Sequence, residues 1–271
     1  MNRVLSGRLG RLLLLVVPAA GLLIPESLHP DPHALGSVYQ SVSPVVDWWI
    51  QLHLLLFALF TLLAFAVFVS LDDVQGPAAI AARVALGIFV AATCAFVGTE
   101  GIGMGLVIRG AQGLPAAQQA GVDQAVQALW DSQIANALGL LGHLLFWVLS
   151  VGATAVALYS SARRRLPLAL LGLIVLWVML AVRVVPVSLQ VAAVVSALLW
   201  VTVVTVVGAH DRAAIVPFGL LVLAMLLPQH GDALGAVGAA SVGLALVWRE
   251  LSPQRRTGIA VTATPATAAP V

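Results

Sequence analysis

The segment 48–71, WWIQLHLLLFALFTLLAFAVFVSL, contains no Asp, Glu, Lys or Arg, and this feature restricts the possible folds most strongly. A helix of about 20 apolar residues is long enough to cross the hydrocarbon core of a bilayer. Similar runs recur along the chain, and charged residues make up only 9% of it. In soluble domains, charged residues make up about a quarter of the chain. We therefore predict an all-α fold, a polytopic integral membrane helical bundle surrounded by lipid.

The apolar runs predict about eight transmembrane helices. Seven would result if the short first run, or the short seventh and eighth runs, did not insert separately. Together the spans form a single transmembrane domain over residues 1–250. The spans are expected within residues 1–25, at 48–71, from about 78 onward, and at 134–160, 166–182, 187–208, 213–227 and 233–248.

The third run is longer than the hydrocarbon thickness at the rise of an α-helix. We therefore expect this helix to tilt, or to break within its glycine-rich part at 98–105. Small residues recur along it at three-, four- and seven-residue steps, which predicts a face that another helix approaches closely. That face consists of Gly87, Cys94, Gly98, Gly101 and Gly105.

Two segments differ from the spans in composition. Residues 115–131 are too polar to cross a membrane, but Val122, Val126 and Trp130 recur at helical spacing together with Ala125 and Leu129. We expect an amphipathic helix on the outer membrane surface or over the mouth of the bundle. Residues 251–271 are rich in Pro, Thr and Ala, which predicts a disordered cytoplasmic tail.

The basic residues predict the orientation of the chain, because cytoplasmic loops carry an excess of Lys and Arg. With eight spans and both termini cytoplasmic, only Arg109 and Arg183 lie on the outer side, and every other arginine lies inside. We predict a multi-pass protein of the cell membrane. Arg without any Lys, in a chain rich in Ala, Val, Leu and Gly, is typical of a high-GC bacterial genome. The net charge of +2 does not indicate nucleic-acid binding.

The segment HPDPH at 29–33 holds two histidines in the first predicted outer loop. Imidazole nitrogens bind transition metals, so His29 and His33 are candidate metal ligands. The prolines disfavour a helix that would place both rings on one face. We therefore favour a solvated loop over a metal site at this segment.

His53 and His143 fall inside predicted spans, near the outer side. Ionisable groups within spans usually face the bundle interior or a cavity. Opposed histidines on two helices can ligate a metal or a haem iron. Alternatively, each ring packs in the bundle and bonds a backbone carbonyl.

Glu100 is an isolated acid in the outer half of the third span. It would either form an ion pair with Arg109 or Arg183, or serve as a proton or cation site. In the second case it could also join His53 and His143 as a metal ligand.

These residues support three functional hypotheses. The first is a non-enzymatic protein with an outer-facing polar pocket between the second and fifth spans. This pocket binds or passes a small molecule or cation, or serves a membrane-protein partner, and its residues are His53, Glu100, Arg109, His143 and Arg183. The second is a metal or haem protein ligated by the two span histidines. The third is a metal-dependent intramembrane enzyme with the span carboxylate as general base. HExxH and GxSxG motifs are absent, and the sequence assigns no particular cofactor.

Overall fold

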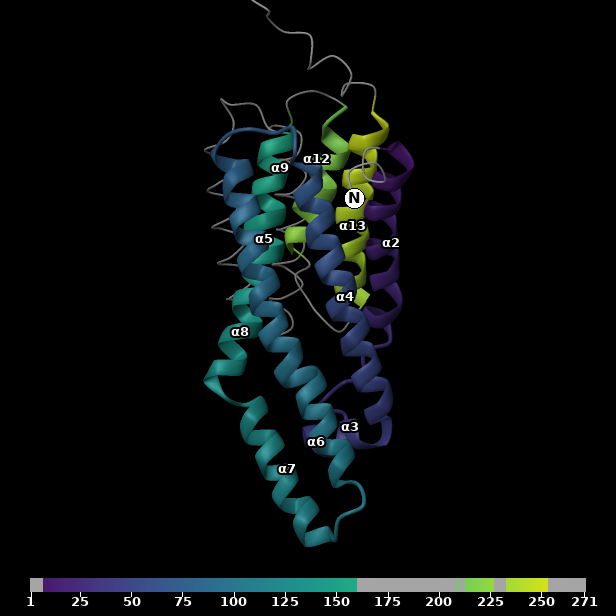
Figure 1. Cartoon of the computed structure of the whole chain (residues 1–271), viewed down its shortest axis with the longest axis vertical. Coiled ribbons are helices and arrows are strands. Elements are labelled where there is room, and N and C mark those ends of the chain that lie inside the picture. Colours follow the sequence, from purple (N-terminus) through teal and green to yellow (C-terminus); the bar gives the residue numbers. More distant parts are fainter. Residues whose placement is uncertain (1–6, 160–208, 210–212, 227–232, 253–271) are drawn as a thin grey trace, which may run out of the picture.

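The structure, a computed structural model, describes residues 7–159, 209, 213–226 and 233–252. The regular secondary structure within these ranges is entirely helical, and the helices form an elongated bundle (Figure 1). The predicted spans at 166–182 and 187–208 lie outside the described residues, as does most of the predicted tail.

Four helical stretches in the described part of the chain are long and apolar enough to cross a membrane: Leu9–Ser27, Val38–Ser70, Pro77–Ala111 and Leu234–Leu251. They correspond to the first, second, third and eighth predicted spans. The fourth and seventh correspond to the shorter apolar helices Leu145–Tyr159 and Ile215–Met225. The protein is therefore a helical membrane protein.

The first span, α2 (Arg8–Ser27), packs against α13 (Ala233–Leu251), so the two ends of the described chain lie side by side (Figure 1). Glycine permits this close approach. A Cβ at Gly243 would lie 2.4 Å from the Cβ of Ala19, far inside van der Waals contact. Helices in lipid associate through such close packing, because the hydrophobic effect does not drive them together there.

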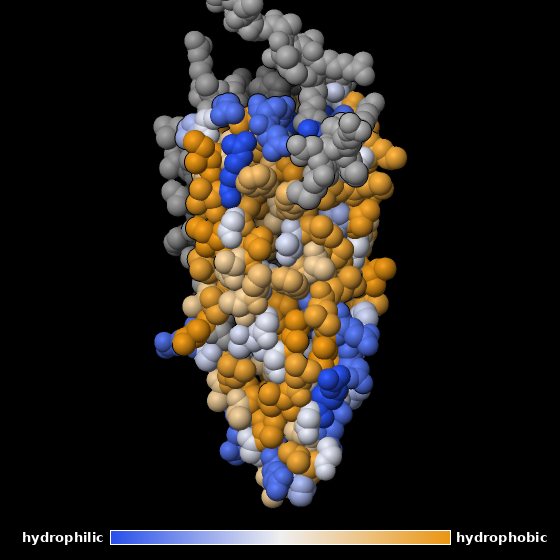
Figure 2. All heavy atoms as spheres, in the orientation of Figure 1, coloured by the Kyte–Doolittle hydropathy of each residue, from blue (hydrophilic) through white to orange (hydrophobic). Residues whose placement is uncertain are grey.

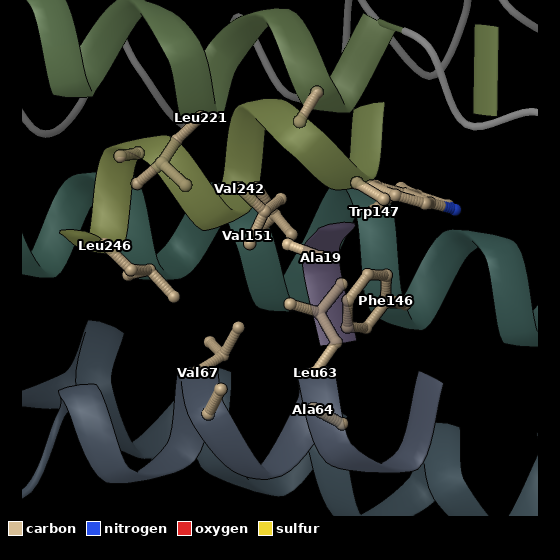
Figure 3. Close-up of a cluster of buried hydrophobic side chains, with 14 of the residues drawn as sticks. Ala19, Leu63, Ala64, Val67, Phe146, Trp147, Val151, Leu221, Val242 and Leu246 are labelled. Atoms are coloured by element: carbon tan, nitrogen blue, oxygen red, sulfur yellow. The ribbon is translucent and has the colours of Figure 1, made fainter. Parts of the chain in front are cut away.

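Apolar side chains of the described helices fill the interior of the bundle. Besides α2 and α13, these helices are α4 (Val46–Ser70), α5 (Pro77–Phe96), α12 (Ile215–Leu226), and the run from η3 (Leu144–Val151) into α9 (Gly152–Tyr159). Their side chains point toward one another in Figure 3. The labelled members of this cluster are Ala19, Leu63, Ala64, Val67, Phe146, Trp147, Val151, Leu221, Val242 and Leu246.

The second and third spans are longer than a membrane requires. Helix α3 (Val38–Val42) and the short η1 (Ser43–Val45) lead directly into α4. Helix α5 (Pro77–Phe96) continues through η2 (Val97–Gly103) into α6 (Met104–Ala111). The continuous stretches contain 33 and 35 residues. At about 1.5 Å per residue they extend roughly 50 Å, whereas the hydrocarbon core is about 30 Å thick.

The excess length forms a lobe at one end of the bundle, here called the distal lobe, built from α3, the start of α4, α6 and α7 (Ala116–Trp130) (Figure 1). It has its own hydrophobic core, separate from that of the bundle. The buried members are Val38, Tyr39, Val42, Val46, Trp49, Ile50, Met104, Ile108, Ala111 and Val126.

Helix α7 is the amphipathic helix predicted at 115–131, but its surroundings differ from the expectation. It packs on α3 and α6 and runs along the long axis of the bundle, not across its mouth (Figure 1). Val126 is buried, and Val122 and Trp130 pack against the lobe core. Ala125 and Leu129 of the predicted apolar face are exposed.

The glycine-rich part of the third span does not break. It continues as the π-helical segment η2 between α5 and α6. A second π-helical segment, η3, follows α8 (Gln133–His143). Such wider turns within α-helices occur frequently at functional sites. Segment η2 packs against α4, and η3 packs against α5.

The end opposite the distal lobe, here called the proximal end, is tied together by arginines. The Arg83 guanidinium donates to the carbonyls of Leu71 and Val74 in the turn between α4 and α5. Arg249, at the end of α13, pairs with Asp73 of the same turn at 2.7 Å. Hydrophilic residues gather at this end in Figure 2, above a broad hydrophobic surface.

Candidate functional site

A buried polar layer lies where the bundle meets the distal lobe. His53 and Trp49 lie one turn apart on α4 and are only 4% and 1% exposed. The Nδ1–H of His53 donates to the carbonyl of Trp49 at 2.7 Å, and the two ring centres are 4.4 Å apart. This bond satisfies one ring nitrogen within the helix itself and fixes the ring's orientation.

Gly101 of η2 joins the third span to this layer. The Trp49 Nε1–H donates to the Gly101 carbonyl at 2.8 Å. A Cβ at Gly101 would lie 2.2 Å from Cδ2 of His53 and 2.8 Å from its Cβ, so only glycine fits. The predicted close-approach face is confirmed here and at Gly105, which meets Ile50 and Trp49. The described part of the chain does not show such contact at the other three positions: no described atom lies within 4 Å of a Cβ at Gly87 or Gly98, and Cys94 is exposed.

The histidines of HPDPH diverge. His29 is half-buried, and its ring centre lies 5.2 Å from the ring centres of both Trp49 and His53. His33 is exposed, and its ring lies against Trp130 of α7 with 5.7 Å between centres. The two rings therefore contact different neighbours. Instead of being simply solvated, the loop packs at both ends, and His29 joins the buried layer.

Glu100 is 5% exposed within η2. Arg109, one of its two expected partners, instead pairs with Asp47 at 3.4 Å on the exposed surface of the lobe. The predicted Glu100–Arg109 pair is therefore wrong, and Arg183 lies outside the described residues. The carboxyl group makes no hydrogen bond or ion pair with any described residue.

His143 is the last residue of α8, and its side chain is not among those described. The predicted pairing of His53 with His143 around a metal or haem therefore remains a prediction. Among the described side chains, no group of three or more His, Cys, Asp or Glu is placed to hold a metal ion. His53, Glu100, His29 and His33 thus do not form a three-ligand cluster.

An apolar cleft lies next to the polar layer, between α4, α5, α8 and η3. It encloses about 40 Å³ and is open on one side. The Phe96 ring closes one part of the cleft by packing directly on Gly139. A Cβ added at Gly139 would lie only 2.9 Å from Cε2 of this ring. The cleft is lined by Leu56, Phe60, Phe89, Thr93, Phe96, Val97, Leu138, Gly139, Gly142 and Trp147.

The buried ionisable residues lie at one end of this cleft. Glu100 follows Phe96 and Val97 by about one turn along η2, and His53 precedes Leu56 by about one turn of α4. The sequence predicted a polar pocket, whereas this cleft is aromatic, with polar groups beyond one end. Sequence reasoning missed Phe89 and Phe96, whose only signal was aromatic character within an apolar run.

Comparison with protein-family models, with curated proteins and with solved structures gives no match. The function is therefore inferred from the geometry of the chain itself.

Proposed function

We propose that the protein crosses the cell membrane about eight times, with both termini in the cytoplasm and the distal lobe outside. The distribution of the described charges supports this orientation. Arg11, Arg83 and Arg249 belong to the proximal end, whereas Arg109 is distal. The distal lobe carries the acids Asp47, Asp123 and Asp131.

Cysteine labelling tests this topology. In a Cys94→Ser background, Ala117→Cys places a thiol on exposed α7, and Gln75→Cys places one in the exposed proximal turn. In right-side-out membrane vesicles, a membrane-impermeant maleimide is expected to label Ala117→Cys. Gln75→Cys should react only after permeabilisation. Labelling of Gln75→Cys in sealed vesicles would contradict the proposed orientation.

The proposed activity is non-enzymatic binding of a small organic cation at the cleft. The observation that carries it is a buried carboxyl group, Glu100, about one turn beyond an aromatic cleft. Phe60, Phe89, Phe96 and Trp147 supply ring faces that attract a cation and also bury an apolar body. Because no described arginine neutralises Glu100, its carboxylate is the natural counter-charge for a ligand's ammonium group.

Entry of such a ligand requires the cleft to widen. Its enclosed volume of about 40 Å³ is far below the 300–1,000 Å³ typical of ligand pockets. The Phe96 ring packs on Gly139, and its rotation would open the cleft toward α8. Ligand binding is therefore coupled to movement of this ring.

Calorimetric titration of the purified full-length protein with benzyltrimethylammonium tests the proposal. Glu100→Gln, which keeps the shape and removes the charge, is expected to weaken binding at least tenfold. Hydrogen bonds to charged groups contribute about 1.5–3 kcal/mol, and 1.4 kcal/mol is tenfold in affinity. The matched control is Asp131→Asn, an exposed distal carboxylate, which should bind as the original chain does.

A pair of glycine variants tests the location. Gly142 lines the cleft and a Cβ there meets only the Thr93 hydroxyl, at 3.7 Å, so Gly142→Leu fills the cleft without a backbone clash. It should abolish binding, whereas Gly87→Leu, on the open face of α5, should not. The proposal is refuted if the original chain does not bind the probe, or if Glu100→Gln or Gly142→Leu binds as tightly as its control.

A further inference from the structure

We infer that His29 and His53 together form a binding site for one divalent transition-metal ion of the Zn²⁺ or Cu²⁺ class. The two residues are 24 positions apart in the sequence and belong to different structural elements, the 28–36 loop and α4. The fold brings their rings into contact at the junction of the bundle and the distal lobe. This site differs from the cleft described above and does not depend on the proposed binding of an organic cation.

The spacing of the rings fits shared ligation. A tetrahedral ion with metal–nitrogen distances of about 2.0–2.1 Å holds the centres of its two imidazole rings about 5 Å apart. The ring centres of His29 and His53 are 5.2 Å apart, with 73° between the ring planes. The distance between the two ring centres is therefore compatible with ligation of one ion by both imidazoles.

The tautomers of both histidines also suit metal binding. A carbonyl oxygen only accepts hydrogen bonds, so the nitrogen facing it must carry the proton. Nδ1 of His53 faces the Trp49 carbonyl at 2.7 Å, and Nδ1 of His29 faces the Pro30 carbonyl at 2.9 Å. In each neutral ring the lone pair therefore resides on Nε2. Metal-binding histidines are oriented in this way by their second nitrogen.

Both rings are held in place by surrounding contacts. His53 is confined between Trp49 and Gly101. The backbone just before His29 is anchored, because the Trp48 Nε1–H donates to the Leu28 carbonyl at 3.2 Å. A preorganised pair of donors loses less conformational entropy on binding an ion than a flexible pair does.

The donor set defines the kind of site. Imidazole nitrogens favour Zn²⁺, Cu²⁺ and Ni²⁺ over Mg²⁺ or Ca²⁺, which prefer oxygen ligands. Two protein ligands leave coordination positions for water or for an incoming donor. The site is therefore open, unlike the closed four-ligand sites that stabilise small domains.

Zn²⁺ titration of the purified full-length protein, prepared in detergent without a histidine tag, tests the inference. The expected result is one Zn²⁺ per chain, with affinity reduced at least tenfold in His29→Ala and in His53→Ala. His33→Ala is the matched control, since it removes the other histidine of HPDPH and should bind Zn²⁺ unchanged. The Cu²⁺ form should show two coordinated nitrogens by electron paramagnetic resonance, and one in His29→Ala.

His29→Ala keeps the test decisive even if His53→Ala fails to fold, because His29 lies in a loop and is only half-buried. The inference is overturned by absence of Zn²⁺ binding, by unchanged affinity in His29→Ala, or by an equal loss in His33→Ala. Glu100→Gln separates this site from the organic-cation site. It should lose benzyltrimethylammonium binding and keep Zn²⁺ binding, and loss of Zn²⁺ there would contradict a site made of the two imidazoles.

Discussion

Replacing Trp49 by alanine is expected to lower the free energy of unfolding by about 3–5 kcal/mol, the usual cost of truncating a buried aromatic side chain. Trp49 is 1% exposed and belongs to the core of the distal lobe. Its ring also contacts His29 and His53, and its Nε1–H bonds the Gly101 carbonyl. The variant removes packing and a link between α4 and η2 together. Thermal unfolding in detergent measures the loss.

Two further variants separate these contributions. Trp49→Phe keeps much of the ring and removes the hydrogen bond to Gly101. The Gly101 carbonyl still accepts from the Met104 N–H, so the variant should cost only about 0.5–1.5 kcal/mol, the net contribution of one hydrogen bond. Trp248→Ala removes a tryptophan that is 44% exposed and should cost much less than Trp49→Ala. Equal effects of Trp49→Ala and Trp248→Ala would show that Trp49 does not hold the junction together.

Gly101→Ala is expected to destabilise the protein by about 3 kcal/mol, at the upper end of the usual cost of overpacking. The added methyl group would meet Cδ2, Cγ and Cβ of His53 at 2.2, 2.5 and 2.8 Å. The histidine Cβ moves only with its backbone, so α4 and η2 must separate. Displacement of His53 should also weaken Zn²⁺ binding at least tenfold. Thermal unfolding and Zn²⁺ titration measure the two effects.

Gly98→Ala is the control within the same π-helical segment. A Cβ there meets nothing within 4 Å, and alanine favours helix over glycine by about 0.5–1 kcal/mol. This variant should therefore be neutral or slightly more stable. If Gly101→Ala were as stable as Gly98→Ala, the tight contact between η2 and His53 would be refuted.

The positions of several helices could be predicted from the sequence because lipid imposes a strict requirement on composition. A segment free of charged residues at 48–71 coincides with α4, Val46–Ser70. The amphipathic pattern near 115–131 likewise identified α7, because its buried face recurs every three or four residues. These features depend on local composition and period alone.

The buried layer could not be predicted because it depends on contacts between distant segments. His29 was paired with His33 within one short motif, yet the fold carries it to His53. Arg109 was expected to pair with Glu100 on the same span, but nine residues along a helix separate their side chains by more than two turns. Asp47 of the neighbouring α4 is closer to it.

The π-helical segments could not be predicted from the sequence either. Sequence periodicity assumes about 3.6 residues per turn, and a wider turn changes which residues share a face. The side chains that follow η2 and η3 are therefore rotated relative to the expected stripes.

If the distal lobe projects into the aqueous phase as proposed, the length of the second and third spans places the two ends of the same helix in different solvents. In the bundle, α4 is surrounded by lipid, where packing and hydrogen bonds hold helices together. In the distal lobe, the preceding turns would be surrounded by water, where burial of apolar surface is itself the driving force. Urea weakens the second kind of stabilisation directly, whereas a change of lipid or detergent acts on the first. The stability of one half of this continuous helix should therefore depend on urea, and the stability of the other half on the lipid or detergent.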